Sequence, residues 1–384
     1  MGRGGEGDEA KRAQLAGPGM GNYDALKQSL PDNYASLLDR KQTQQALFLA
    51  KRLIEEGLQR ELNLMPVQVP LLVTEESGLN DTLDRDGART PVAFTIQNDE
   101  PEHAVHAQIV QAVTKWKRKA LLEYGLTNPG EGLITDMRAV RKDYWLDIDH
   151  SSYVDQWDWE VTITDEQRNL DTLVSVVKKI YRVLKDTERE VHGQFPQLND
   201  PRYPDLPDDI KFIHAEDLLK MFPDLPRKER ETAILKQEKA VFLYGIGWVL
   251  DNGVPHEMRA ADYDDWSTEV EHGGQKYHGL NGDILVWNPV TNRRHELSSM
   301  GVRVDANQLR IQMSMANPVD NWENLEYHKG ILTNEYPLSI GGGIGQGRVM
   351  MLLLKKAHIG EVTVTVWPEK LHEICREKNI FALS

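Results

Sequence analysis

The chain has 384 residues, of which 40% are hydrophobic and 27% charged, a composition that excludes disorder of the whole chain. Its 45 basic and 60 acidic residues leave a formal net charge of −15, which disfavours any general binding of DNA or RNA. The single cysteine, Cys375, excludes an internal disulfide and a thiolate-rich zinc site and indicates a reducing compartment.

Targeting signals do not stand out in the sequence. No run of about 18 apolar residues is present, and the N-terminus lacks the apolar stretch of a signal peptide. Met1-Gly2 resembles the start of a myristoylation signal, but Glu6 occupies the position that requires Ser or Thr. We therefore expect a cytoplasmic protein that does not associate with a membrane.

The amino-acid composition of the chain changes near residue 22. Residues 1–21 carry many glycines among charged residues and have almost nothing to bury, which predicts a disordered tail. From Asn22 onward the composition is that of a globular protein, without a linker or a repeat. The simplest organisation is one domain over residues 22–384.

Four stretches have clear periodicity. Apolar residues recur at intervals of three and four over residues 42–63 and again over 170–184, so both stretches are predicted to be amphipathic helices. Apolar and polar residues alternate over residues 299–305 and 361–367, which predicts two strands. Because helices and strands interleave unevenly, an α+β fold is favoured over a doubly wound sheet.

The most conspicuous motif is the glycine run Gly341-Gly-Gly-Ile-Gly-Gln-Gly-Arg348, which opens onto an apolar stretch. It matches neither the dinucleotide-binding nor the Walker pattern. One interpretation is a tight turn with a surface arginine. The other is a nucleotide site, because glycines let a ligand approach the backbone and the planar guanidinium of Arg348 can stack on a base.

A second motif covers residues 150–160. Side chains of a strand alternate between faces, so Gln156, Asp158 and Glu160 share one face while Trp157 and Trp159 share the other. The tryptophans indicate that their face packs under helices in the middle of a sheet. A half-exposed edge strand with solvated polar residues is the alternative.

A third cluster spans residues 281–289 and 296–305. Ser299, Gly301, Arg303 and Asp305 lie on one face of the predicted strand. A hairpin would also bring the carboxylates of Asp283 and Glu296 together, as suits magnesium. The alternative is a structural ion pair of Arg303 with Asp305 or a neighbour.

Other charged segments have ordinary explanations. Residues 115–118 (Lys-Trp-Lys-Arg) and 138–141 are typical of solvated basic faces, and residues 262–266 suggest an acidic turn. His272, His278 and His295 lack the spacing of a zinc site.

Taken in chain order, these segments resemble the ammonia-dependent asparagine synthetases, which are aspartate–ammonia ligases built on the catalytic core of class II aminoacyl-tRNA synthetases. The resemblance covers nearly the whole chain after the tail. It is carried by residues 115–118, 153–160, 262–268, 280–289, 296–301 and 341–348.

The resemblance implies a fold with a mainly antiparallel sheet flanked by helices. Residues 63–70, ending in Pro70, resemble the first class II motif, which implies a homodimer. Residues 137–141 and 151–160 resemble the paired strands of the second motif, with Arg141 as its arginine. Residues 341–354 resemble the third motif, in which Arg348 stacks on adenine.

The implied reaction activates L-aspartate with ATP to β-aspartyl-AMP, which ammonia converts to L-asparagine and AMP. ATP and Mg²⁺ are the implied co-substrate and metal. The implied catalytic residues are Arg141, Lys117 and Asp264. The implied ligands of aspartate are Asp81, Lys117, Gln156, Asp158, Ser299 and Arg303. Those of ATP are Arg141, Ser151, Asp283, Gly343 and Arg348, and those of the metal are Asp283 and Glu296.

The sequence disfavours two alternatives to this assignment. An aspartyl- or asparaginyl-tRNA synthetase would need an anticodon-binding domain and a basic surface, which neither the chain length nor its charge of −15 favours. A non-catalytic synthetase paralogue would be expected to lack Arg141 and Arg348, which are both present. Free ammonia is the expected nitrogen donor, because Cys375 lies in a C-terminal amphipathic stretch where it suits a buried apolar role.

Overall fold

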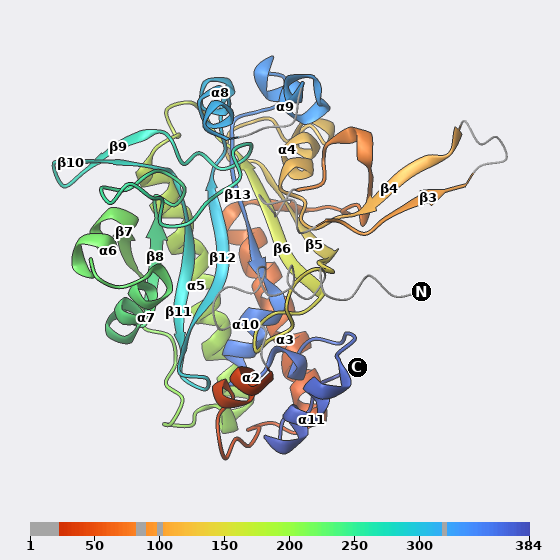
Figure 1. Cartoon of the computed structure of the whole chain (residues 1–384), viewed down its shortest axis with the longest axis vertical. Helices are drawn as coiled ribbons and strands as arrows, with labels where there is room; N and C mark the ends of the chain where they lie inside the picture. Colours follow the sequence, from red (N-terminus) through yellow and green to blue (C-terminus); the bar gives the residue numbers. More distant parts are fainter. Residues whose placement is uncertain (1–22, 82–89, 98–102, 317–320) are drawn as a thin grey trace, which may run out of the picture.

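The computed structural model describes residues 23–81, 90–97, 103–316 and 321–384 (Figure 1), so the predicted disordered tail lies outside the described residues. The described residues form an eight-stranded sheet in which the two outer pairs, β1 with β5 and β7 with β8, are parallel and the other pairs are antiparallel. In order across the sheet, the strands are β1 (Leu64–Pro66), β5 (Gly132–Val140), β6 (Tyr153–Thr162), β13 (Ser339–Gly345), β12 (Arg293–Val302), β11 (Asn281–Asn288), β8 (Ala240–Tyr244) and β7 (Lys211–His214).

Two long helices pack on one face of this sheet (Figure 1), and both were predicted from periodicity. Helix α3 (Arg40–Leu62) begins with a capping box, in which the Asp39 side chain accepts a hydrogen bond from the backbone of Gln42 at 2.8 Å. Helix α5 (Leu170–Gln194) is capped at its N-terminus by Asn169, whose side chain accepts a hydrogen bond from the Thr172 backbone. The mainly antiparallel sheet and its helices confirm the predicted α+β fold.

Shorter elements surround the sheet. Two small ribbons project from it on opposite sides in Figure 1, one containing β3 and β4 and the other β9 and β10. Their strands are β2 (Leu72–Thr74), β3 (Ala93–Ile96), β4 (Val105–Ile109), β9 (Glu269–His272) and β10 (Gln275–His278). The remaining helices are α2 (Tyr23–Ser29), α4 (Thr114–Glu123), α6 (Ala215–Met221), α7 (Arg227–Glu238), α8 (Ala306–Met315), α9 (Glu326–Leu332), α10 (Gln346–Leu353) and α11 (Glu369–Glu377).

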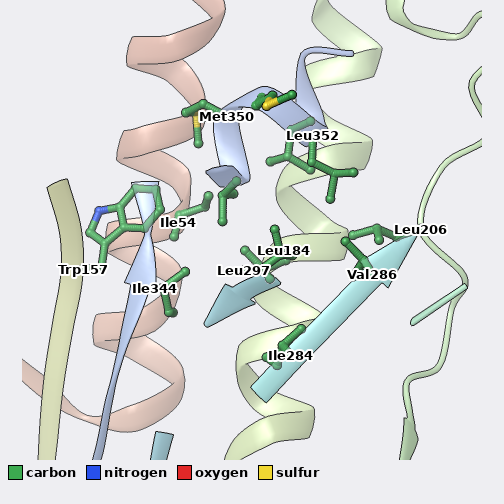
Figure 2. Packing of buried hydrophobic residues seen from close by; sticks show 14 of the residues in the cluster. Ile54, Trp157, Leu184, Leu206, Ile284, Val286, Leu297, Ile344, Met350 and Leu352 are labelled. Carbon is green, nitrogen blue, oxygen red and sulfur yellow. The ribbon is translucent and has the colours of Figure 1, made fainter. Parts of the chain in front are cut away.

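The main core lies between the sheet and the helices α3, α5 and α10 (Figure 2). Trp157 and Trp159 of β6 are buried in it, which confirms that the alternation over residues 150–160 belongs to a central strand. The neighbouring strand β13 is rich in glycine because the backbones pack tightly. A Cβ on Gly342 would lie 2.5 Å from the Cβ of Met300 and 2.8 Å from the carbonyl oxygen of Ser299.

The predicted strand over residues 361–367 is wrong. A short 3₁₀ helix (Ile359–Glu361) is followed by a segment without regular structure, and Val364 and Val366 are exposed. The segment alternates in sequence, but no strand of the described residues pairs with it to complete a ladder. The predicted strand over 299–305 forms only in part, because β12 ends at Val302 and Asp305 is the N-cap of helix α8. Among the described residues, no helix combines the length and apolar character needed to cross a membrane.

Candidate active site

A cavity of about 1170 Å³ opens on the face of the sheet opposite α3 and α5. Its position follows from β6, whose tryptophans point into the helical core while Gln156 and Asp158 point into the cavity. Every residue predicted for the site except Lys117 and Asp283 lines it. These residues are Asp81, Arg141, Ser151, Gln156, Asp158, Asp264, Glu296, Ser299, Arg303, Gly343 and Arg348.

Lys117 lies directly behind the cavity wall. Its ammonium donates to Asp158 Oδ1 at 2.6 Å and to the carbonyl oxygen of Gly342 at 2.7 Å. The side chain is completely buried, so the interpretation of residues 115–118 as a solvated basic face is wrong. The other oxygen of Asp158, Oδ2, is buried and accepts no hydrogen bond from any described residue. A buried acceptor of this kind is suited to a cationic ligand.

Arg303 is held from two sides by carboxylates. Its Nε donates to Glu160 Oε1 at 2.9 Å, its Nη2 donates to Glu160 Oε2 at 2.8 Å, and its Nη1 donates to Asp264. Gly341 makes room for this pair, because a Cβ there would lie 1.8 Å from Glu160 Oε2. The alternative ion pair with Asp305 is not formed, since Asp305 caps helix α8 instead.

The pKa values of the two carboxylates around Arg303 are shifted in opposite directions. Burial tends to raise the pKa of Glu160, but the charge and hydrogen bonds of Arg303 outweigh it and lower that pKa. Burial dominates at Asp264 and raises its pKa in spite of Arg303 and Arg259. Glu160 is therefore the firmly ionised partner of the guanidinium.

Asp81 lies at the N-terminus of helix α4. Its carboxylate accepts from the backbone amides of Thr114 at 2.9 Å and Lys115 at 3.4 Å, and burial raises its pKa. The ammonium of Lys115 instead pairs with Asp262 at 2.7 Å. Residues 262–266 are therefore largely enclosed rather than forming a solvated acidic turn.

The loop between β5 and β6 contacts Arg348, the arginine of the glycine-rich segment. Arg348 Nε lies 3.3 Å from the carbonyl oxygen of Asp149, and its Nη2 lies 3.1 Å from His150 Nε2. Burial alone would lower the pKa of His150, but the carboxylates of Asp149 and Asp147 raise it to about 9. Arg348 thus faces the cavity, and the interpretation as a surface arginine on a tight turn is wrong.

Three other residues predicted to bind ATP are Arg141, Ser151 and Gly343. The side chains of Arg141 and Ser151 donate hydrogen bonds to backbone carbonyl oxygens. Arg141 Nε donates to the carbonyl oxygen of Gln111 at 3.1 Å, and its terminal nitrogens donate to no described residue. The Ser151 hydroxyl donates to the carbonyl oxygen of Tyr153 at 2.5 Å. Gly343 leaves space beside Gln156, since a Cβ on the glycine would lie 3.0 Å from Gln156 Oε1.

Asp283 and Glu296 belong to the β11–β12 hairpin, as predicted. The Asp283 carboxylate contacts Arg259 through Oδ2, while its Oδ1 is buried without a hydrogen bond from any described residue. Burial raises the pKa of Asp283 to about 7, opposed by Arg259 and reinforced by Glu296. A buried carboxylate with a free oxygen, close to a second carboxylate, is a donor set that fits a divalent cation.

Several residues around the cavity were not assigned to the site from the sequence. Glu160 was placed on the correct face of β6 by alternation, but its contact with Arg303 depends on the pairing of strands far apart in the chain. Arg259 and Asp149 lie in segments without periodicity, so no pattern marked them, and His150 opens the motif of residues 150–160 but received no role from it.

Comparisons with known proteins show the family of the chain. The family model of aspartate–ammonia ligase matches residues 41–379. An aspartate–ammonia ligase of Clostridium tetani is 46% identical over 354 residues, which is 92% of this chain and 97% of that protein. Another, of Bacillus cytotoxicus, is 45% identical over 347 residues, covering 90% of this chain and 99% of that protein.

Solved structures show the same fold at low identity. An Entamoeba histolytica asparaginyl-tRNA synthetase has a TM-score of 0.60 at 15% identity, covering 84% of this chain and 67% of that one. A Pyrococcus horikoshii asparaginyl-tRNA synthetase complexed with asparaginyl-adenylate also has a TM-score of 0.60, at 14% identity, with 86% and 70% covered. The fold is therefore that of class II synthetases, and the chain belongs to the aspartate–ammonia ligase family.

Proposed function

We propose that this enzyme joins ammonia to L-aspartate with ATP through β-aspartyl-AMP, yielding L-asparagine, AMP and pyrophosphate. The observation that carries the proposal is the buried pair of charges in one cavity, a free carboxylate oxygen on Asp158 and a guanidinium on Arg303. An amino acid carries an ammonium and a carboxylate, so this pair matches its two charged ends.

The aspartate pocket follows from the donors that remain available. Arg303 uses three of its five N–H groups on Glu160 and Asp264, which leaves two for the α-carboxylate of the substrate. Asp158 Oδ2, supported by Asp81 and Gln156, would accept from the α-ammonium. Lys117, Ser299 and Asp264 would complete the surroundings of the side-chain carboxylate and of the incoming ammonia.

The ATP side is assigned to the opposite part of the cavity. Arg348 would stack on adenine, and Arg141, Ser151 and Gly343 would border the α-phosphate. Asp283 and Glu296 would hold Mg²⁺, which neutralises phosphate charge when bound. A cation beside Asp283 would also favour the ionised form of its carboxylate, whose pKa is raised in the protein alone.

A cytoplasmic enzyme without a nucleic-acid partner is part of this proposal, in keeping with the net charge of −15. The competing function is aminoacylation of tRNA, because asparaginyl-tRNA synthetases share this fold. Incubation with tRNA, ATP and aspartate or asparagine separates the two, because a tRNA synthetase would yield charged tRNA.

The central test is a product assay with ammonium and, in parallel, with glutamine freed of ammonia. We expect AMP and asparagine with ammonium and at least 10-fold slower synthesis with glutamine, because Cys375 is buried and burial raises its thiol pKa to about 12. Cys375→Ala should leave both rates within about twofold. Formation of ADP would contradict the adenylate route, and selective loss of glutamine-dependent synthesis in the variant would identify Cys375 as a glutaminase nucleophile.

We also propose a homodimer formed through the first-motif region. The elements of this region carry exposed apolar side chains, on α3, on β1, at the start of β2 and on the β3–β4 ribbon, namely Phe48, Met65, Leu71, Leu72, Phe94, Ile96 and Val105. Light scattering at micromolar protein should give about twice the chain mass of 43.8 kDa. Leu72→Asp should shift the mass towards that of one chain, and a wild-type monomer would refute the proposal.

A further inference from the structure

Four basic side chains come from the first residues of two elements in contact, α7 and β12. Arg227 and Lys228 begin helix α7, and Arg293 and Arg294 begin strand β12. All four line the cavity, and we call them the basic rim. None belongs to the residues assigned above to aspartate, adenine or the metal. In a chain with a net charge of −15, such a grouping needs a physical explanation.

Half of the basic rim is neutralised by the protein itself. Arg227 pairs with Glu257 at 2.6 Å, and Arg294 pairs with Glu231 at 2.9 Å. Glu231 is buried and also contacts His256 at 2.9 Å, so it fixes Arg294 from behind. These two arginines therefore have internal partners and defined positions.

The other half of the basic rim has no such partners. The side chains of Lys228 and Arg293 make no hydrogen bond or ion pair with the rest of the described chain. Burial, followed by the charges of Arg294 and Arg227, lowers the pKa of Lys228, and the carboxylates of Glu257 and Glu231 only partly oppose this shift. An anion on the rim would oppose the shift further.

The basic rim is continuous with the carboxylates assigned to the metal. Arg294 precedes Glu296 by two residues on β12, so both can project from the same face of the strand. On the other side, Glu257 pairs with Arg227, and Arg259, two residues further on, contacts Asp283. An anion on the rim would therefore lie beside Asp283 and Glu296.

We propose that the basic rim is a subsite for two linked phosphate groups, those that end ATP and leave as pyrophosphate. The inference rests on the proposed function. When the aspartate carboxylate oxygen bonds to the α-phosphorus, the bond from that phosphorus to the bridging oxygen breaks and its electron pair leaves with pyrophosphate. Lys228 and Arg293 stabilise the negative charge that develops there, and no proton is required.

The test removes the two unpaired cations together in Lys228→Ala/Arg293→Ala. We expect about a 10-fold higher inhibition constant for pyrophosphate and a severalfold higher KM for ATP. Inhibition by AMP, which lacks the terminal phosphates, and the KM for aspartate should stay within about twofold. The matched control is Lys179→Ala/Arg182→Ala on α5, which removes the same charge outside the cavity and should change none of these values.

Calorimetry of pyrophosphate binding with Mg²⁺ separates the subsite from the reaction. Weaker binding to the rim variant than to the control variant supports the subsite. Equal binding to both, or a matching loss for AMP and aspartate, overturns it. If the wild type makes no asparagine and AMP, the proposed function fails, whereas the calorimetric comparison still decides the subsite. Lys228→Arg/Arg293→Lys should keep binding within about threefold, since it keeps both charges.

Discussion

Glu160→Gln is expected to raise the KM for aspartate by about 10- to 100-fold while the KM for ATP stays within about twofold. Glu160 fixes the guanidinium of Arg303 through Nε and Nη2, and glutamine can accept from only one of them without placing its amide donors against the other. Hydrogen bonds between charged groups contribute about 1.5–3 kcal/mol, which corresponds to this range of affinity. Steady-state kinetics with each substrate varied in turn measures the effect.

A stability measurement accompanies this test, because Glu160 and Arg303 are both buried. Removing one partner of a buried pair costs about 3–5 kcal/mol, so urea unfolding should show a loss of about that size. The matched control is Ser339→Ala, which removes one hydrogen bond to Glu160 Oε1 and should cost only about 1 kcal/mol. Equal increases in both KM values would show general damage and would contradict a positioning role for Glu160.

Strand β6 shows how far the sequence predicts this site. The alternation of polar residues with Trp157 and Trp159 placed Gln156, Asp158 and Glu160 on one face, and the structure has this arrangement. Such a prediction succeeds because the period of a strand is a local property of the backbone. The two long helices were predictable for the same reason.

Contacts between distant segments were not predictable from residue types. The charges of residues 115–118 look like a solvated surface, yet Lys117 is buried because β6 and β13 supply Asp158 and a carbonyl oxygen to it. Arg303 has an acidic residue two positions away, Asp305, but pairs with Glu160, 143 residues distant. Only the order of strands in the sheet decides such partners.

The prediction of a strand over residues 361–367 is wrong for a related reason. Its alternation resembles that of β6, but a strand forms only where a neighbouring strand offers backbone partners. Here Glu361 instead accepts hydrogen bonds from the backbone of Ala357 and from Tyr34, and Pro368 cannot donate to a ladder. The alternation of residue types therefore predicted an extended backbone, but it could not predict whether a neighbouring strand would pair with that backbone.

Asp283→Asn is expected to lower kcat by at least about 100-fold at saturating ATP and aspartate. The buried Oδ1 of Asp283 accepts no hydrogen bond from any described residue and is the oxygen assigned to Mg²⁺, and an amide removes its charge. A loss of this size corresponds to about 2.7 kcal/mol, which is within the several kcal/mol attributed to a metal that stabilises charge in a transition state. Initial rates measured against free Mg²⁺ should also show a higher half-saturating concentration.

The matched control for this variant is Asp217→Asn, which makes the same chemical change at a carboxylate outside the cavity. Asp217 accepts from the Tyr277 hydroxyl at 2.9 Å, so its replacement should leave kcat within about twofold. The double variant Asp283→Asn/Glu296→Gln should be little slower than Asp283→Asn alone, because two ligands of one ion act as a unit. If Asp283→Asn retains more than a third of the wild-type kcat with an unchanged Mg²⁺ dependence, Asp283 does not hold the metal, and its buried carboxylate serves only to pair with Arg259.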